Sequence, residues 1–157
     1  MADLISDGKI RVAWVPTVAN IAAPTAVELN AGLLLAGVMT PDGLKTDSTT
    51  AEVDNSSLIS TFDTRRAGRR GFSNSVKIKR QDSADTALTT LVYRATGFLV
   101  VRRGPTDATV AWTVGDKVEV FPSECGDRMP SYGPNSIQAF EVPMFNTSQP
   151  NVDAIVA

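Results

Sequence analysis

Short stretches in which apolar and polar residues alternate recur along the chain, and this pattern predicts strands. In Lys9–Val15 every second residue is a large apolar one, and Val76 and Ile78 alternate with serine and lysine. Phe98–Val101 is apolar throughout and is a strand candidate for that reason. Further strands are predicted at Leu33–Val38, Leu58–Phe62, Val110–Val114, Lys117–Phe121 and Ser136–Phe145.

The spacing of apolar residues becomes helical after Asp82, Ser83 and Asp85, which are all residue types that cap helices. We therefore predict one α-helix over about residues 83–93. Its apolar side chains are those of Ala84, Leu88, Leu91, Val92 and Ala95. A second, brief helix is predicted at Pro24–Asn30, with the proline near its first turn.

Polar and turn-forming residues mark the connections between these elements. Gly115-Asp116 lies between two strand candidates, which predicts a tight hairpin turn. Residues 44–70 are predicted to form a long polar loop, and residues 146–157 a C-terminal arm that docks on a neighbouring chain or stays loose. Pro143 favours an edge or terminal position for its strand, because proline has no N–H to donate.

Together these elements predict a mainly β fold in a single domain over residues 1–157. About six to eight short strands with one convincing helix favour an antiparallel β-sandwich or barrel that carries a flanking helix over about residues 83–93.

Composition gives the chain no visible catalytic chemistry. Its 157 residues carry a net charge of -2 and include no histidine, the commonest general base and transition-metal ligand. Cys125 is the only cysteine, so a disulfide within the chain and a multi-cysteine zinc site are both excluded. Phosphate-binding glycine motifs and the G-x-S-x-G motif are absent. We expect no enzyme activity and no catalytic, cofactor-binding or metal site.

The sequence also gives no reason to expect membrane binding. The N-terminus carries acidic residues early and lacks the layout of a signal peptide. The longest apolar run, Ala31–Met39, is too short to span a bilayer.

The densest charge in the chain is a cluster of arginines inside the polar stretch 44–70. Its members are Arg65, Arg66, Arg69 and Arg70, and Arg102-Arg103 repeats the pattern at a strand end. Guanidinium groups match phosphates and carboxylates, so the cluster is interpreted as a nucleic-acid contact, a contact to acids of a neighbouring subunit, or a solvated loop. The net negative charge and the lack of interleaved aromatic residues weigh against nucleic acid.

Three segments resemble the major tail (tail tube) proteins of long-tailed, non-contractile phages of actinobacteria. The first is the opening MADLISDGKIRVAWVPTVAN, with a PDGL turn further on. The second is VKIKRQDSADTALTTLVYRATGFLVVRRG, which is similar to that family's strand–helix–strand block, and the third is VGDKVEVFPSECGDR. The resemblance covers most of the chain, and it carries over no active-site residues.

The resemblance implies a structural subunit of the virion tail. Subunits of this family would form hexameric rings that stack into a tube, with phage DNA passing through the lumen without sequence-specific binding. The implied partners are other copies of the chain, a tape-measure protein, and the tail terminator and tail-tip proteins, with assembly in the host bacterial cytoplasm. Under this reading the arginine cluster meets acids of a neighbouring subunit or ring; the candidate acids are Asp42, Asp47, Glu52 and Asp54.

Two other readings stay open at this stage. One is a different ring-forming head–tail or tail component with the same fold, and the other is a monomeric β-barrel module that binds a small ligand or an oligonucleotide.

Overall fold

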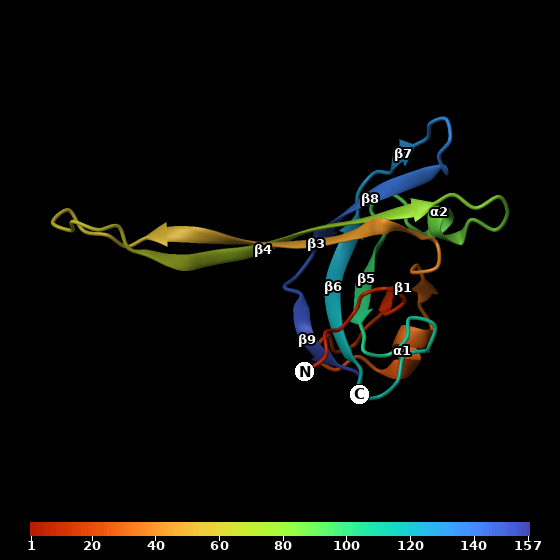
Figure 1. Ribbon diagram of the computed structural model, residues 1–157, viewed down its shortest axis with the longest axis horizontal. Helices are drawn as coiled ribbons and strands as arrows, with labels where there is room; N and C mark the ends of the chain where they lie inside the picture. The colour runs from red at the N-terminus through yellow and green to blue at the C-terminus, as the bar shows by residue number, and fades with distance from the viewer.

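The computed structural model describes the whole chain, Met1 to Ala157, as one antiparallel sheet from which a long hairpin projects (Figure 1). The strand order is β2-β1-β5-β6-β8-β4-β3, with β7 paired to β8 and β9 paired to β6. The strands are β1 Ile10–Val15, β2 Leu33–Leu34, β3 Met39–Asp54, β4 Arg65–Lys79, β5 Thr96–Arg103, β6 Lys117–Cys125, β7 Met129–Ser131, β8 Ala139–Asn146 and β9 Asn151–Ile155. The mainly β, antiparallel fold predicted from the sequence is confirmed.

Two apolar cores lie on opposite faces of the strands β1, β5 and β6. Val12, Trp14 and Leu99 belong to one core, and their strand neighbours Ala13 and Val100 belong to the other. Successive side chains of a strand point to opposite faces, so the same three strands supply both cores. The first core is completed by β4 and β8, which therefore pack across it, and the second is completed by α1 and β9.

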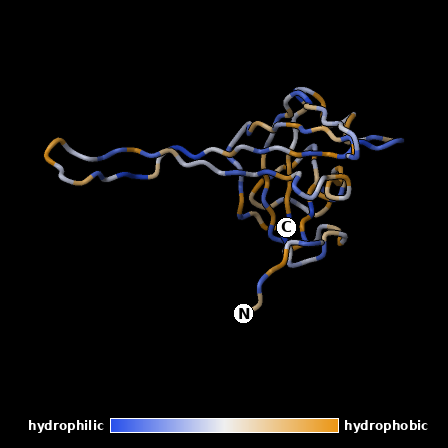
Figure 2. Tube along the Cα trace, turned by 45° about the horizontal axis from the view of Figure 1, so that its top comes forward, coloured by the Kyte–Doolittle hydropathy of each residue, from blue (hydrophilic) through white to orange (hydrophobic).

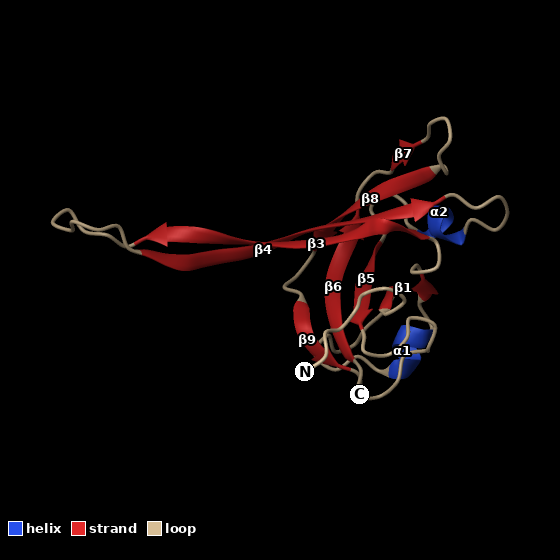
Figure 3. Cartoon of the chain, viewed as in Figure 1, coloured by secondary structure: helices blue, strands red, loops and turns tan.

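Two short helices flank the sheet, α1 at Ala26–Asn30 and α2 at Thr86–Thr90 (Figure 3). In α1, the side chain of Thr25 accepts a hydrogen bond from the Glu28 N–H and the Glu28 carboxylate accepts one from the Thr25 N–H, which is a reciprocal capping box. The predicted brief helix is confirmed, and the predicted helix 83–93 is present but shorter. Neither helix is long and apolar enough to cross a membrane.

The polar stretch 44–70, predicted as a long loop, instead forms most of β3 and the first part of β4. These strands pair with each other from Leu44↔Val76 out to Asp54↔Arg65, and only residues 55–64 connect them. The loop prediction was wrong because it required an apolar face for a strand. Both strands are polar and lack the alternation of a half-buried strand. Backbone hydrogen bonds between them stabilise the hairpin instead.

Residues 110–114 do not form the predicted strand, and the predicted hairpin at Gly115 is absent. This segment is instead part of a loop whose carbonyl groups surround the buried guanidinium of Arg102. Trp112 is buried as expected, but it packs against Arg11 and Arg102, with each guanidinium carbon 5.4 Å from the ring centroid. The buried guanidinium of Arg102 needs hydrogen-bond acceptors, and the loop adopts the conformation that supplies them. The alternation of apolar and polar residues gives no sign of this requirement.

Two other strand predictions are shortened or lost. The predicted strand 33–38 is reduced to the two residues of β2 and is followed by a turn that buries Leu35. Residues 58–62 lie at the exposed end of the long hairpin and form no strand. Their apolar side chains have no core against which to pack.

The strand that contains Pro143, β8, is not at an edge, because it pairs with β4 on one side and with β6 and β7 on the other. β7 pairs with residues 139–141 and β6 with residues 144–146, so the proline lies at the junction of the two partners. Its carbonyl accepts from the Gly126 N–H at that junction. Proline is tolerated there because the missing donor falls where no ladder hydrogen bond is needed.

The C-terminal segment 146–157, predicted as an arm, is docked on its own chain. β9 pairs with β6, and Ala154 and Val156 are buried in the second core.

Candidate assembly surfaces on the hairpin arm

The outer part of the β3–β4 hairpin is unsupported by the rest of the chain. β4 begins at Arg65 but pairs with β8 only from Asn74 onward, so residues 65–73 have β3 as their one partner. At about 3.3 Å per residue this part extends roughly 30 Å. We call Asp47–Ser73 the arm; Figure 1 shows it pointing straight away from the body.

The root of the arm is fixed to the body by side chains. The guanidinium of Arg103 in β5 donates to Thr46 Oγ1 at 2.9 Å and to both carboxylate oxygens of Glu119 at 2.9 and 3.0 Å. The amide of Asn74 donates to Asn146 Oδ1 at 3.1 Å. These contacts set the direction in which the arm leaves the body.

Two bulges shape the hairpin, and a glycine lies at each. The pairing register shifts between Met39 and Leu44 and again between Thr50 and Glu52. A Cβ at Gly43 would lie 2.6 Å from the carbonyl oxygen of Lys77, and one at Gly68 would lie 2.9 Å from Val53 Cγ2. The close approach of the two strands at these points therefore requires glycine.

The tip loop, residues 55–64, is closed by hydroxyl groups. The Asn55 N–H donates to the Thr64 carbonyl at 3.1 Å, and the Thr64 N–H donates to Ser56 Oγ at 2.9 Å. The carboxylate of Asp54 accepts from the Ser56 N–H at 2.8 Å, and these hydrogen bonds from Ser56 lower the pKa of Asp54. The loop is thus ordered locally without any apolar packing.

Large apolar side chains are exposed at this tip. Leu58, Ile59 and Phe62 are 103%, 91% and 79% exposed. Figure 2 shows the hydrophobic stretch at the far end of the arm. The sequence pattern predicted a short strand for these residues and did not indicate that they form an exposed apolar surface. The signal available was three large apolar residues within a stretch that is otherwise polar.

The predicted contact residues all lie on the hairpin, but the structure brings only some of them together. Arg65 forms an ion pair with Glu52 of the same arm, so this pair is satisfied within one chain. The other members form no ion pair in the chain: Arg66, Arg69, Arg70, Asp42, Asp47 and Asp54. Three arginines of the cluster therefore remain available to a partner.

A groove of about 630 Å³ lies beside the arm root, between β4 and the connection from β8 to β9. Arg69, Arg70 and Phe72 line it from β4, and Phe145 and Val152 line it from the other side. Phe145 is 63% exposed and Val152 42% exposed. The groove thus combines unpaired positive charge with a few apolar side chains among polar ones, which suits a segment that is both acidic and apolar.

No group of three or more potential metal-ligating side chains is present in the chain. The free thiol of Cys125 is buried; burial and the neighbouring Glu124 raise its pKa to about 11.

Comparison with known proteins identifies relatives of the whole chain. The family model described as phage tail tube protein matches residues 1–157. A search of curated proteins found no match. Among solved structures, the chain is similar to one in the cryo-EM structure of the anti-feeding prophage (AFP) baseplate, 6-fold symmetrised, with a TM-score of 0.63 over 96% of each chain and 7% sequence identity. At that identity the similarity shows a shared fold.

Proposed function

The chain belongs to the phage tail tube protein family and is a structural component of the virion tail; we propose that it assembles into hexameric rings that stack into the tail tube. The tube is the conduit through which DNA leaves the virion. The chain has no catalytic role in this proposal, and its partners are its own copies, a tape-measure protein and the proteins that close the two ends of the tube. Assembly takes place in the host bacterial cytoplasm.

The arm is the observation that supports this proposal. An isolated two-stranded hairpin is marginally stable in water, and its outer edges present unpaired backbone groups. This arm also carries three exposed apolar side chains at its tip, Leu58, Ile59 and Phe62. A subunit with such an arm gains stability when a neighbouring subunit covers it.

Ring geometry fits a subunit whose contact surfaces differ. Contacts between unlike surfaces close into a ring when the rotation between neighbours is a whole fraction of a turn. A second contact along the ring axis then produces a stacked tube. The similar fold in a baseplate solved with 6-fold symmetry supports six subunits per ring.

The same similarity favours a second candidate, a ring component located at the end of the tail. Such a component forms one ring and stops, whereas a tube subunit stacks. Light scattering at rising concentration separates the two, since only the tube subunit continues to grow.

Substitution of the tip tests the role of the arm. Burial of one large apolar side chain contributes about 1.5–3 kcal/mol, so the triple variant Leu58→Ser/Ile59→Ser/Phe62→Ser is expected to lower the assembled fraction more than tenfold. Thr61→Ala in the same loop is the control, because the Thr61 side chain makes no hydrogen bond. Equal assembly of the triple variant and the wild type, measured by sedimentation, would refute the role of the arm.

A further inference from the structure

The N-terminal segment Met1–Asp7 makes few contacts with its own chain: the Leu4 side chain lies beside Gly104, and the Ser6 carbonyl accepts a hydrogen bond from the Lys9 N–H. Residues Met1–Ser6 form no strand or helix and are exposed, and no hydrogen bond involves residues 1–5. Leu4 and Ile5 are nevertheless 58% and 70% exposed apolar side chains. Asp3 and Asp7 form no ion pair. The segment is therefore acidic, apolar and largely exposed.

The groove beside the arm root has the complementary character. It presents Arg69 and Arg70 from β4, neither of which forms an ion pair, and the exposed side chains of Phe145 and Val152 from its other side. The two carboxylates of the segment can meet the two guanidinium groups on one side of the groove, and its two apolar side chains can meet those on the other side.

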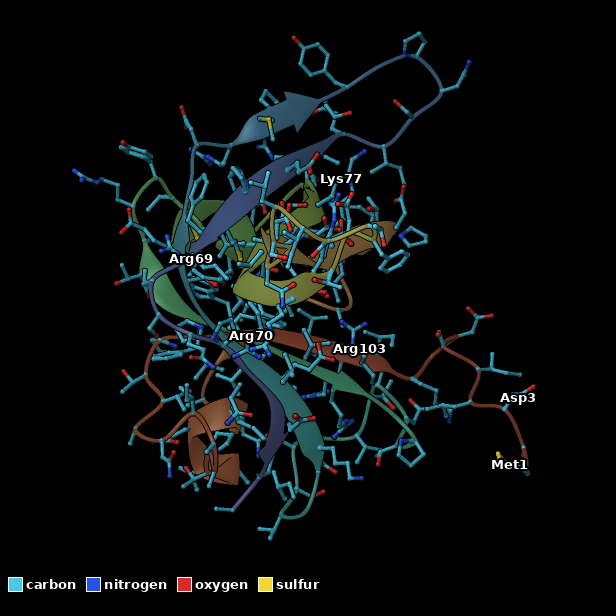
Figure 4. The ribbon with its side chains drawn as sticks, turned by 90° about the vertical axis from the view of Figure 1, so that its left-hand side faces the viewer. Met1, Asp3, Arg69, Arg70, Lys77 and Arg103 are labelled. Atoms are coloured by element: carbon cyan, nitrogen blue, oxygen red, sulfur yellow. The ribbon has the colours of Figure 1, made fainter.

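The two surfaces lie on opposite sides of the body. Seen along the arm in Figure 4, Arg69 lies on one side of the molecule, while Met1 and Asp3 project from the other side. The segment therefore does not reach the groove of its own chain. A projection on one side and a matching groove on the opposite side form the kind of unlike contact that closes a ring of identical subunits.

We infer that the N-terminal segment of one subunit occupies the groove of the next subunit in the ring, with Asp3 and Asp7 facing Arg69 and Arg70 and with Leu4 and Ile5 against Phe145 and Val152. This inference rests on the proposed ring. Exposed apolar side chains also lie at the arm tip, at the end of the long axis of the molecule (Figure 1), and on the connection from β7 to β8, at Tyr132 and Ile137.

Charge exchange tests the pairing. Arg69→Glu/Arg70→Glu and Asp3→Lys/Asp7→Lys are each expected to raise the concentration at half-assembly at least tenfold, and their combination in one chain is expected to restore it to within about threefold of the wild type. Arg94→Glu/Lys117→Glu changes the net charge equally at residues that do not line the groove, and it is expected to have no effect. Circular dichroism of each variant monomer confirms folding.

Cross-linking tests the contact directly and needs no intact charge pair. In assembled material, Leu4→Cys/Val152→Cys is expected to give a ladder of covalent oligomers with a short bismaleimide, and each single variant is expected to give no ladder. Cys125 is buried with a raised pKa and contributes little background.

The outcomes separate this inference from the proposed ring. Rings without a Leu4–Val152 cross-link, and without any effect of charge exchange, would overturn the inference and leave the ring in place. A cross-link from Leu58→Cys to Val152→Cys would show that the arm tip fills the groove, which would also overturn it. A chain that stays monomeric under all conditions would overturn both.

Discussion

The guanidinium of Arg102 donates a hydrogen bond to Oδ2 of Asp116 at 2.8 Å, and the side chains are only 1% and 11% exposed. Arg102 also donates to the carbonyl groups of Asp107, Val110 and Ala111 at 2.8, 2.7 and 3.2 Å. One buried cation thus holds the whole connection between β5 and β6 against the second core, beside the ring of Trp112.

Arg102→Met is expected to destabilise the subunit by about 3–5 kcal/mol, because it removes the cation that pairs with the nearly buried Asp116 carboxylate and the donor to three carbonyls. Arg103→Met is the control. Its guanidinium pairs with Glu119 at the surface, where an ion pair contributes less than about 1 kcal/mol. Urea denaturation of both variants measures the difference, and equal costs would contradict the role given to Arg102.

The contribution of Asp116 should depend on pH. Burial alone would raise the pKa of Asp116, but hydrogen bonds from the Thr113 N–H and from Arg102 outweigh it, so the pKa is lowered. A carboxyl group whose folded-state pKa is lowered stabilises the fold above its unfolded pKa of about 3.9 and loses that contribution as pH falls through the folded value.

The free energy of unfolding of Asp116→Asn should therefore fall below that of the wild type at neutral pH and approach it below about pH 4. Denaturation curves of both proteins between pH 7 and pH 3 provide the test. A difference that stays constant over this range would mean that the charge of Asp116 has no part in the stability.

Gly97→Ala is expected to destabilise the first core. A Cβ at this position would lie 2.7 and 2.8 Å from two ring carbons of Trp14 and 3.0 Å from the Val15 carbonyl oxygen. Forced displacement in a packed core costs about 1–3 kcal/mol. Gly37→Ala, where a Cβ would meet no atom within 4 Å, should change stability by less than about 0.5 kcal/mol. The test is to compare the thermal unfolding midpoints of the two variants with that of the wild type. An unchanged midpoint for Gly97→Ala would contradict the close packing of Gly97 against Trp14.

Cys125 should react only when the subunit unfolds. With a pKa raised to about 11 and a side chain inside the first core, the thiol is both protonated and inaccessible at pH 8. The rate of reaction with a thiol reagent is expected to be at least a hundredfold lower than that of a Thr61→Cys variant, and urea should abolish the difference. Rapid labelling of the native wild type would show that β6 opens readily.

The strands with clear apolar alternation could be predicted from the sequence, as in Lys9–Val15 and Val76–Ile78. The arm could not, because it consists of threonine, serine and charged residues on both faces, and its strand structure comes from pairing between β3 and β4. Burial of Arg102 could not be predicted either. An arginine pair at a strand end is typical of a surface, and the four acceptors around this one converge only in the folded loop.

The candidate site was predicted in part. The arginine cluster and the polar acids do lie together on the hairpin, and the hypothesis that they contact neighbours stays a prediction for Arg66, Arg69 and Arg70. Arg65 differs, since register places it beside Glu52 of its own arm. The exposed tip was missed because apolar residues alone do not reveal whether a core covers them.

Electron microscopy of the purified chain at rising concentration, with class averages of the end-on views, tests directly whether the subunits form hexameric rings that stack. Rings of six subunits with a central channel are expected, and they should stack into tubes as concentration increases. Monomers at every concentration, or closed rings with a subunit number other than six, would contradict this expectation.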